Sequence, residues 1–266
     1  MQRIINLLIF QSTEPRALDR ISPWVDRRFP VSIEEEMERL EKQGHRRAMK
    51  SHLPIDGLPL FDEVKYVHVA RDGRDMCMSY HNHVTGFNAE ALAALDRAGR
   101  DDATINRPYP RAQTDPAAFF RTWLTEGVIP DQTDGLPTVS YFELERSYWE
   151  ERKRSNLLFV HYNDLKRNLN QEMRRLADFL DISIPEKLWP ELELAATFET
   201  MKQQGDRLSP GASSTFVDGA QRLYFKASND RWRDVLTEDD LKLYHDKIGT
   251  LPPDCARWLT GGGSVA

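Results

Sequence analysis

The sequence predicts an α/β fold, a single domain with a central parallel sheet flanked by helices. Two β-rich apolar runs, Lys65–Ala70 and Asn156–Tyr162, have the composition of strands buried on both faces. Segments with the apolar spacing of helices separate and follow them, and strands that alternate with helices favour a parallel sheet. Ligands bind such sheets beyond the carboxyl ends of the strands, so the residues that follow the two runs are the first site candidates.

The composition limits the function. Of 266 residues, 36 are Lys or Arg and 42 are Asp or Glu, which gives a net charge of −6. We therefore expect no nucleic-acid partner, although a local basic pocket can still hold a small anion. Two cysteines, Cys77 and Cys255, cannot form a disulfide framework, so we expect a reducing, cytoplasmic location. No apolar run reaches the roughly 18 residues of a membrane span, so we expect no membrane partner.

The first part of the chain carries helix signals. Within Met1–Phe10 the apolar positions 1, 4, 5 and 8 lie on one helix face, which favours a buried helix over a targeting segment. Ser32 and Glu35 have the spacing of a capping box before a charged helix. Residues 46–51 are expected to form a short strand.

Further helices follow the first expected strand. Asp72 is an N-cap candidate directly after it. Residues 203–221 are rich in Gly, Ser and Asp, which predicts a mobile loop. Three other helices are expected. One includes Phe119, Trp123 and Val128, one covers residues 169–180, and one runs from Thr237 to Lys247.

The first candidate site is the turn at Arg71. This residue lies between the strand and the helix start at Asp72, where free N–H groups and the positive end of the helix dipole favour an anion. A guanidinium grips a phosphate by paired hydrogen bonds. Ser79 shares a helix face with Asp72 and Asp75 and offers a hydroxyl. The alternative is that Arg71 only pairs with an acidic neighbour.

The second candidate site is Lys50-Ser-His-Leu-Pro54. His52 is suited to act as a base near neutral pH, and Lys50 to neutralise a departing anion. The alternative is that His52, one of seven histidines, is structural. His81 and His83 form a possible metal pair, but no third ligand has suitable spacing, so no metal is expected.

In these segments the chain resembles the cytosolic-type sulfotransferases, which use 3'-phosphoadenosine 5'-phosphosulfate (PAPS). The resemblance runs from about Met1 to about Leu259. Lys50–Pro54 resembles their Lys-Thr-His-Leu-Pro segment. Arg71 and Ser79, eight residues apart, match their Arg-Asn-Pro-Lys-Asp-x-x-x-Ser signature. Further similar segments follow in family order, at Asn156–Lys166, Ala196–Met201 and Trp232–Thr237.

The resemblance implies transfer of a sulfuryl group from PAPS to a hydroxyl or amine of a small-molecule acceptor. The nucleotide product is adenosine 3',5'-bisphosphate (PAP), and no metal is required. It implies that His52 is the general base and that Lys50 steadies the sulfuryl oxygens. It also implies cofactor contacts, with Arg71, Ser79 and Lys226 at the 3'-phosphate and Tyr162 and Phe198 at the adenine.

The chain departs from the family pattern at its start. The family places a phosphosulfate-binding loop, Pro-Lys-Ser-Gly-Thr-Thr-Trp, before its first helix, and Met1–Asn6 is similar to the helix that follows. The resemblance thus implies a P-loop nucleotide-kinase-like fold whose first strand is absent here. It implies an N-terminally incomplete domain over 1–260 and a flexible tail over 261–266. The alternative is a truncated or inactive paralogue that binds 3'-phosphoadenosine nucleotides without turnover.

Two departures lie late in the chain. The family's Arg-Lys-Gly segment reads Phe225-Lys226-Ala227, which weakens the implied phosphate clamp. Of the family's dimer motif only Arg233 and Thr237 match, so dimer formation by that route is not expected.

Overall fold

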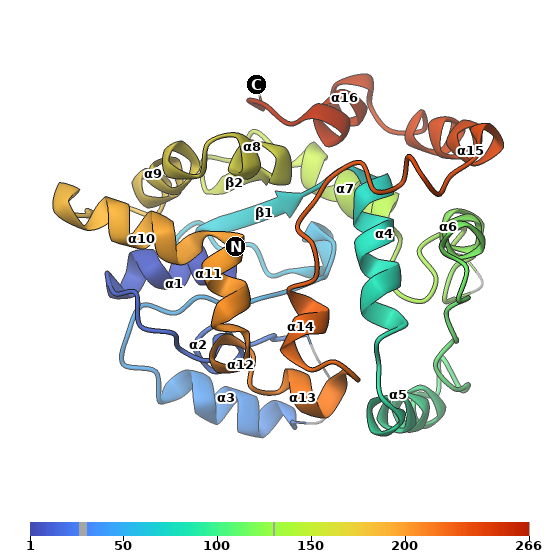
Figure 1. The fold of residues 1–266 in the computed structure, drawn as a ribbon, viewed down its shortest axis with the longest axis horizontal. Helices are drawn as coiled ribbons and strands as arrows, with labels where there is room; N and C mark the ends of the chain where they lie inside the picture. Colours follow the sequence, from blue (N-terminus) through green and yellow to red (C-terminus); the bar gives the residue numbers. More distant parts are fainter. Residues whose placement is uncertain (27–30, 130, 266) are drawn as a thin grey trace. The chain divides into compact units, whose positions relative to one another are not determined.

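The computed structural model describes residues 1–26, 31–129 and 131–265 of the chain (Figure 1). The chain groups into two compact units. Unit 1 combines Met1–Leu53 with Asn168–Ala227, and unit 2 combines Pro54–Arg167 with Ser228–Ala266. Each unit is described below by itself.

Unit 2 contains a parallel sheet of two strands within the described residues, β1 (Tyr66–Ala70) and β2 (Leu157–His161). Both predicted strands and their parallel pairing are confirmed. The register pairs Ala70 with His161, so the two carboxyl ends coincide. The expectation that β1 is buried on both faces is wrong, because Val69 is 42% exposed.

Helices follow both strands in unit 2, and Figure 1 shows α4 continuing from the end of β1. An aromatic core joins α6 and α7 to β2 and α16, and it contains Trp123, Phe142, Phe159 and Trp258. The helical elements are η1 (Ile55–Gly57), α4 (Gly73–Val84), α5 (Ala89–Asp101), α6 (Pro116–Thr125), α7 (Tyr141–Glu150), α8 (Tyr162–Arg167), α15 (Glu238–Ile248) and α16 (Pro253–Gly261).

Unit 1 is helical in its described residues apart from one isolated β-bridge. Its core lies where α1 packs on α9 and α10, around the fully buried Leu7 and Leu8. The elements are α1 (Gln2–Phe10), α2 (Leu18–Ile21), α3 (Ile33–Glu41), α9 (Leu169–Phe179), η2 (Glu186–Leu188), α10 (Trp189–Ala196), α11 (Phe198–Gln203), α12 (Gly205–Leu208), α13 (Ala212–Thr215) and α14 (Ala220–Leu223).

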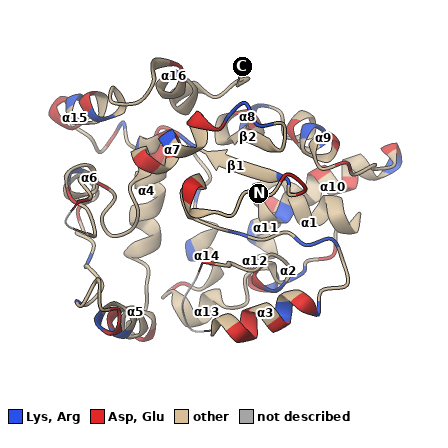
Figure 2. Ribbon diagram, turned by 180° about the vertical axis from the view of Figure 1, so that it is seen from behind, with Lys and Arg blue, Asp and Glu red and all other residues tan. Residues whose placement is uncertain are grey.

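Several local predictions for unit 1 are confirmed. The first helix forms, although its buried face is turned to include Arg3 and Leu7 rather than Ile5. The capping box forms at Ser32, whose side chain accepts a hydrogen bond from Glu35 N. Figure 2 shows acidic residues gathered on the α3 helix that follows, as its charged sequence predicted.

Two predictions for unit 1 are wrong. Residues 46–51 form no strand, and only Lys50 makes a bridge, to Trp24. Residues 203–221 are not a loop, because α12, α13 and the start of α14 lie there. Leu208 and Phe216 are buried and anchor these short helices, a burial that glycine and serine content does not reveal.

The end of unit 2 makes specific contacts. Gly263 N donates to the Asp164 carboxylate at 2.8 Å, and the Trp258 indole donates to Gly263 O at 3.0 Å. The flexible tail predicted over 261–266 stays a prediction, and residue 266 lies outside the described residues. No helix in the described part of the chain is both long and apolar enough to cross a membrane.

Candidate functional site

The sheet register builds the first part of the site. Because Ala70 pairs with His161, the residues that follow the two strands, Arg71 and Tyr162, are neighbours at the carboxyl edge. The Arg71 guanidinium carbon lies 4.4 Å from the centre of the Tyr162 ring. This is the distance of a cation–π contact. Two of the residues predicted to bind nucleotide are therefore in contact.

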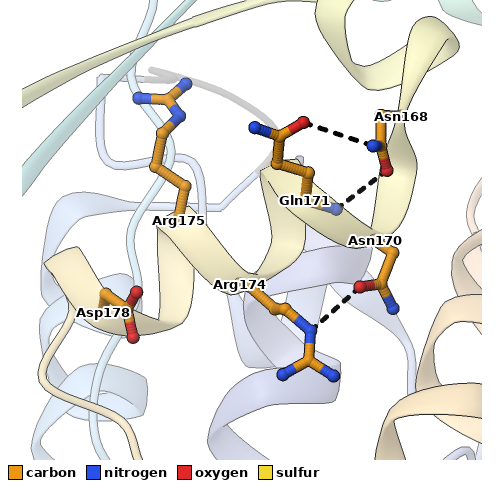
Figure 3. A pocket seen from close by; sticks show the side chains of 6 residues that line it. All are labelled: Asn168, Asn170, Gln171, Arg174, Arg175 and Asp178. Atoms are coloured by element: carbon orange, nitrogen blue, oxygen red, sulfur yellow. Dashed lines mark hydrogen bonds between the residues drawn. The ribbon is translucent and has the colours of Figure 1, made fainter.

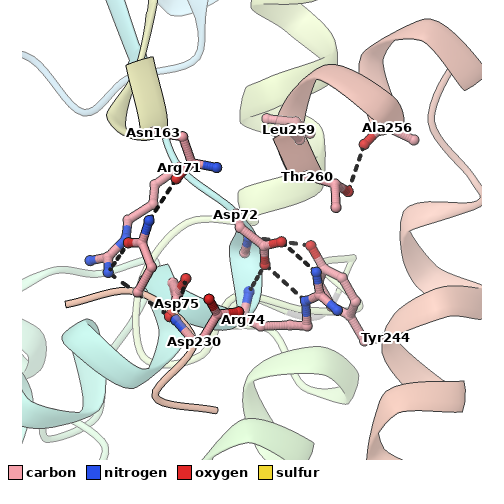
Figure 4. Close-up of polar contacts among 12 residues, drawn as sticks. Arg71, Asp72, Arg74, Asp75, Asn163, Asp230, Tyr244, Ala256, Leu259 and Thr260 are labelled. Carbon is pink, nitrogen blue, oxygen red and sulfur yellow. Dashed lines mark hydrogen bonds and ion pairs between the residues drawn. The ribbon is translucent and has the colours of Figure 1, made fainter. Parts of the chain in front are cut away.

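The backbone of the Arg71 turn is fixed from two sides. The Tyr141 hydroxyl donates to Arg71 O at 2.8 Å, and the Tyr244 hydroxyl accepts from Gly73 N at 3.2 Å. Asp72 caps α4, as predicted, by accepting from Arg74 N at 2.9 Å (Figure 4). A Cβ on Gly73 would lie 2.9 Å from the Tyr141 ring, so only glycine fits between the tyrosines without a shift.

The Arg71 guanidinium is held mainly by neutral groups. Its Nη2 donates to Ser228 O at 2.8 Å and to Asn229 Oδ1 at 2.9 Å. The acidic partner considered from the sequence is present as Asp75, but its Oδ1 lies 3.9 Å from Nη2. Arg71 Nε is buried and has no hydrogen-bond partner among the described residues. A buried donor left unpaired costs stability unless a ligand or water uses it, so this turn has spare capacity for an anion.

Charged groups of both signs lie around Arg71. Burial and then repulsion from Arg71 lower the pKa of Arg231, so a second guanidinium lies within electrostatic range. Burial raises the pKa of Asp75, while the Asp230 N–H and Arg71 act in the opposite direction. Arg71 and Arg231 are thus within electrostatic range of Asp75, and so are the carboxylates of Asp72 and Asp230.

The neighbouring α4 residues differ in exposure. Asp72 and Asp75 are buried, whereas Ser79 is exposed. His81 Nε2 lies 2.9 Å from Gln113 O, and the His83 ring packs edge-on against Phe87. Among residues 1–26, 31–129 and 131–265, no cluster of three or more His, Cys, Asp or Glu side chains is arranged to hold a metal.

The Lys50–His52 segment lies in unit 1 and is organised by Trp24. The bridge to residues 23–25 places Lys50 N 2.8 Å from Pro23 O. Lys50 Nζ then lies 4.8 Å from the Trp24 ring, and the His52 ring lies 4.5 Å from it at 81°. Both predicted catalytic side chains therefore contact one indole. Sequence reasoning missed Trp24, since its pairing with residue 50 is not visible in either segment alone.

The environment of His52 makes it a neutral imidazole. Desolvation, and then the Lys50 ammonium, lower the pKa of His52 to about 4, while Asp26 acts in the opposite direction. The Asp26 carboxylate also accepts from His52 N at 3.2 Å. The residue remains exposed, so solvent screens part of the repulsion from Lys50. At neutral pH the ring is unprotonated and can accept a proton.

Two further predicted residues, Phe198 and Lys226, lie in unit 1. Lys202 contacts Phe198 and the residue before Lys226. Lys202 Nζ lies 5.9 Å from the Phe198 ring and donates to Phe225 O at 3.4 Å. Lys226 follows directly, is exposed, and lies over the Phe225 ring at 5.1 Å. Ala227, which replaces the family's glycine, has a left-handed φ of 50°.

Two surface hollows lie apart from the predicted residues. One follows α9 in unit 1 and is lined by Asn168, Asn170, Gln171, Arg174, Arg175 and Asp178 (Figure 3). Several of its polar groups are paired with protein partners, for example Arg174 Nη1 with Glu186 at 2.7 Å. The other lies in unit 2 beside α15 and includes Arg74 and Lys242. No residue predicted for the site lines either hollow.

Comparisons with known proteins agree on one family. The sulfotransferase domain pattern matches residues 1–252. A glycolipid sulfotransferase of Mycobacterium bovis (strain BCG / Pasteur 1173P2) is 29% identical over 274 residues, which cover 98% of this chain and 84% of that protein. Sulfotransferase 1B1 of Mus musculus is 29% identical over 170 residues, covering 63% of this chain and 48% of that protein.

Solved structures confirm the fold. Retinol dehydratase in a complex with retinol and PAP is similar with a TM-score of 0.68 and 21% identity, covering 94% of this chain and 77% of that one. Mouse sulfotransferase SULT7A1 complexed with PAP has a TM-score of 0.59 and 21% identity, covering 86% of this chain and 74% of that one. The predicted α/β class with a parallel sheet is therefore confirmed.

Proposed function

Because this chain belongs to the sulfotransferase family, we propose that it transfers a sulfuryl group from PAPS to a hydroxyl or amine of a small-molecule acceptor, leaving PAP. The observation that carries this proposal is the Arg71 turn. Its guanidinium carbon lies 4.4 Å from the centre of the Tyr162 ring, and its Nη2 donates to Ser228 O and Asn229 Oδ1. Its buried Nε has no partner among the described residues. Such a preformed cation at the carboxyl edge of a parallel sheet suits a phosphate group.

The proposed nucleotide contacts divide between phosphate and base. Arg71 and Ser79 hold the 3'-phosphate, and Lys226 adds a further cation. Tyr162 and Phe198 contact the adenine. Support comes from the Arg71–Tyr162 contact at 4.4 Å and from the exposure of Ser79 and Lys226, which leaves both side chains accessible to a ligand.

The proposed chemistry needs one base and one cation. His52 accepts the proton of the acceptor hydroxyl or amine, whose freed electron pair forms the new bond to sulfur. The bond between sulfur and the bridging oxygen breaks, and PAP leaves with those electrons. Lys50 neutralises charge on the sulfuryl and bridging oxygens. Charge stabilisation and in-line positioning are the main demands of the analogous phosphoryl transfer.

The acceptor and the location are part of the same proposal. The mycobacterial relatives are named glycolipid sulfotransferases, so a glycolipid hydroxyl is the first acceptor to assay.

Both cysteines, Cys77 and Cys255, are buried free thiols, which supports the reducing cytoplasm as the location.

Calorimetric titration of PAP into the full chain tests the phosphate assignment. Arg71→Ala should weaken PAP binding by about tenfold or more, because it removes a charge-assisted contact. Arg111→Ala is the matched control, since it removes an exposed arginine of unit 2 that is paired only with Asp96 and Tyr109 O. Equal affinities of the Arg71→Ala variant and the unaltered chain would contradict the proposal.

A further inference from the structure

Asn229 connects Arg71 to the turn that follows β2. Its Oδ1 accepts from Arg71 Nη2 at 2.9 Å, and its Nδ2 donates to Asn163 Oδ1 at 2.7 Å. A guanidinium has donors only, so it fixes the orientation of the Asn229 amide, and that amide in turn fixes Asn163.

The chain around Asn229 is anchored on both sides. Ser228 O accepts from Arg71 Nη2 at 2.8 Å, and Asp230 N donates to the Asp75 carboxylate at 3.1 Å. Asp75 is 5% exposed and lies in the first turn of α4, the helix that Arg71 precedes. The segment Ser228–Asp230 is therefore fastened to α4 while its central side chain reaches Asn163.

Tyr162 and Asn163 act on the same guanidinium by different routes. The Tyr162 ring lies under it at 4.4 Å, whereas Asn163 reaches it only through Asn229. A cation–π contact alone does not fix the direction in which the guanidinium donors point. The hydrogen bonds from Nη2 to Ser228 O and to Asn229 Oδ1 fix that direction together. They use both hydrogens of Nη2, so Nη1 and Nε are the donors left for a phosphate.

We propose that Asn229 and Asn163 are positioning residues that set the direction of the Arg71 guanidinium for the 3'-phosphate, without either amide touching the nucleotide. The inference rests on the proposed function, since it assumes that Arg71 receives this phosphate. Their effect is therefore on recognition of the 3'-phosphate and not on nucleotide binding in general.

The test compares PAP with adenosine 5'-phosphate, which lacks the 3'-phosphate, by calorimetry on the full chain. Asn229→Ala should weaken PAP binding about tenfold, because it removes a hydrogen bond to a charged group. Affinity for adenosine 5'-phosphate should stay within about twofold. Asn163→Ala should weaken PAP binding less, and the double variant should match Asn229→Ala alone, because the two residues act in series.

Asn170→Ala is the control, since it removes side-chain amide hydrogen bonds to Glu193 and Arg174 in unit 1. Thermal melts of all variants reveal any loss of folding. The inference fails if Asn229→Ala binds PAP as the unaltered chain does, or if it loses both nucleotides equally. It also fails if the two alanine effects multiply. Loss of PAP selectivity in Arg71→Ala without loss in Asn229→Ala rejects the positioning role alone, whereas no effect in Arg71→Ala rejects the phosphate assignment itself.

Discussion

The turn at Arg71 and the segment at Lys50–His52 carry the two halves of the proposed chemistry, and they are built differently. The Arg71 turn lies between a strand and a helix. It accepts a hydrogen bond from Tyr141 and donates to Ser228 O and Asn229 Oδ1, and these bonds fix it. The Lys50–His52 segment is irregular and is joined by one isolated bridge and the Trp24 ring. The proposed phosphate-binding residue is thus held by several hydrogen bonds, whereas the proposed base is held by few contacts.

Exposure follows the same contrast. The Arg71 side chain is 16% exposed, whereas His52 is exposed overall. A partly buried guanidinium with fixed partners can be oriented before the ligand arrives, which reduces the entropy lost on binding. An exposed imidazole must meet acceptors directly, and it exchanges protons readily with water. Substitutions at the Arg71 turn should therefore affect stability and affinity, and substitutions at the base should affect turnover.

The largest expected effect is on turnover. His52→Ala should lower kcat by about 10²–10⁴-fold, the usual contribution of a positioned base, in an assay with PAPS and a glycolipid acceptor. PAP affinity and the melting temperature should change little, because the exposed ring packs mainly on Trp24. His245→Ala, which removes an exposed histidine of α15, is the control. Undiminished turnover in His52→Ala would end the assignment of this base.

A smaller effect is expected from crowding the rigid turn. Gly73→Ala places a Cβ 2.9 Å from the Tyr141 ring and 3.0 Å from the Tyr244 hydroxyl. Overpacking of this kind costs about 1–3 kcal/mol of unfolding free energy, which urea denaturation measures. PAP affinity should fall as well, because Tyr141 and Tyr244 fix the turn. Gly211→Ala is the control, since nothing lies within 4 Å of its Cβ position. Equal stability of both variants would show that the turn is not rigid.

The charge environment of the base gives a third prediction. The pKa of His52, lowered to about 4 by desolvation and Lys50, should rise in Lys50→Met and fall further in Asp26→Asn. Each change should be a fraction of a unit, because solvent screens charges at an exposed site. NMR titration of the His52 ring protons measures both. Shifts in the reverse directions would show that these neighbours do not set its charge.

The pH dependence of kcat should follow the protonation of His52. The base must be neutral, so kcat should fall as the pH is lowered through the pKa of His52 in the complex. That fall should lie between about 4 and the ordinary value of 6.5. A rate that is unchanged across this window would separate turnover from the protonation of His52.

Local patterns predicted the elements that short-range physics determines. Strand composition located β1 and β2, and capping chemistry located the starts of α3 and α4. The contact between Arg71 and Tyr162 was not predicted. It arises because β1 and β2 pair in parallel and one of these residues follows each strand. The partners of the site residues were missed where they depend on distant chain. Trp24 pairs with residue 50, and Asn229 contacts Arg71 although 158 positions separate them in the sequence. Periodic patterns within one segment do not predict contacts over such separations.

The smallest expected effect lies just before the Asn229 segment. Ala227 adopts a φ of 50°, where an L-residue with a Cβ is strained and glycine is not. Ala227→Gly should raise the unfolding free energy by about 0.5–1 kcal/mol, after the greater chain entropy of glycine offsets part of the relief. Ala256→Gly, inside α16, should lower it by a similar amount, because its backbone is helical.

The Ala227→Gly variant also sharpens the comparison between the two regions. Arg71 is held by Ser228 and Asn229, whose contacts do not use the Ala227 side chain, so PAP affinity should stay within about twofold. A more stable chain with a weaker grip on PAP would mean that strain at Ala227 helps to orient Asn229. In that case the rigidity of the Arg71 turn would depend on the backbone at Ala227 as well as on Tyr141 and Tyr244.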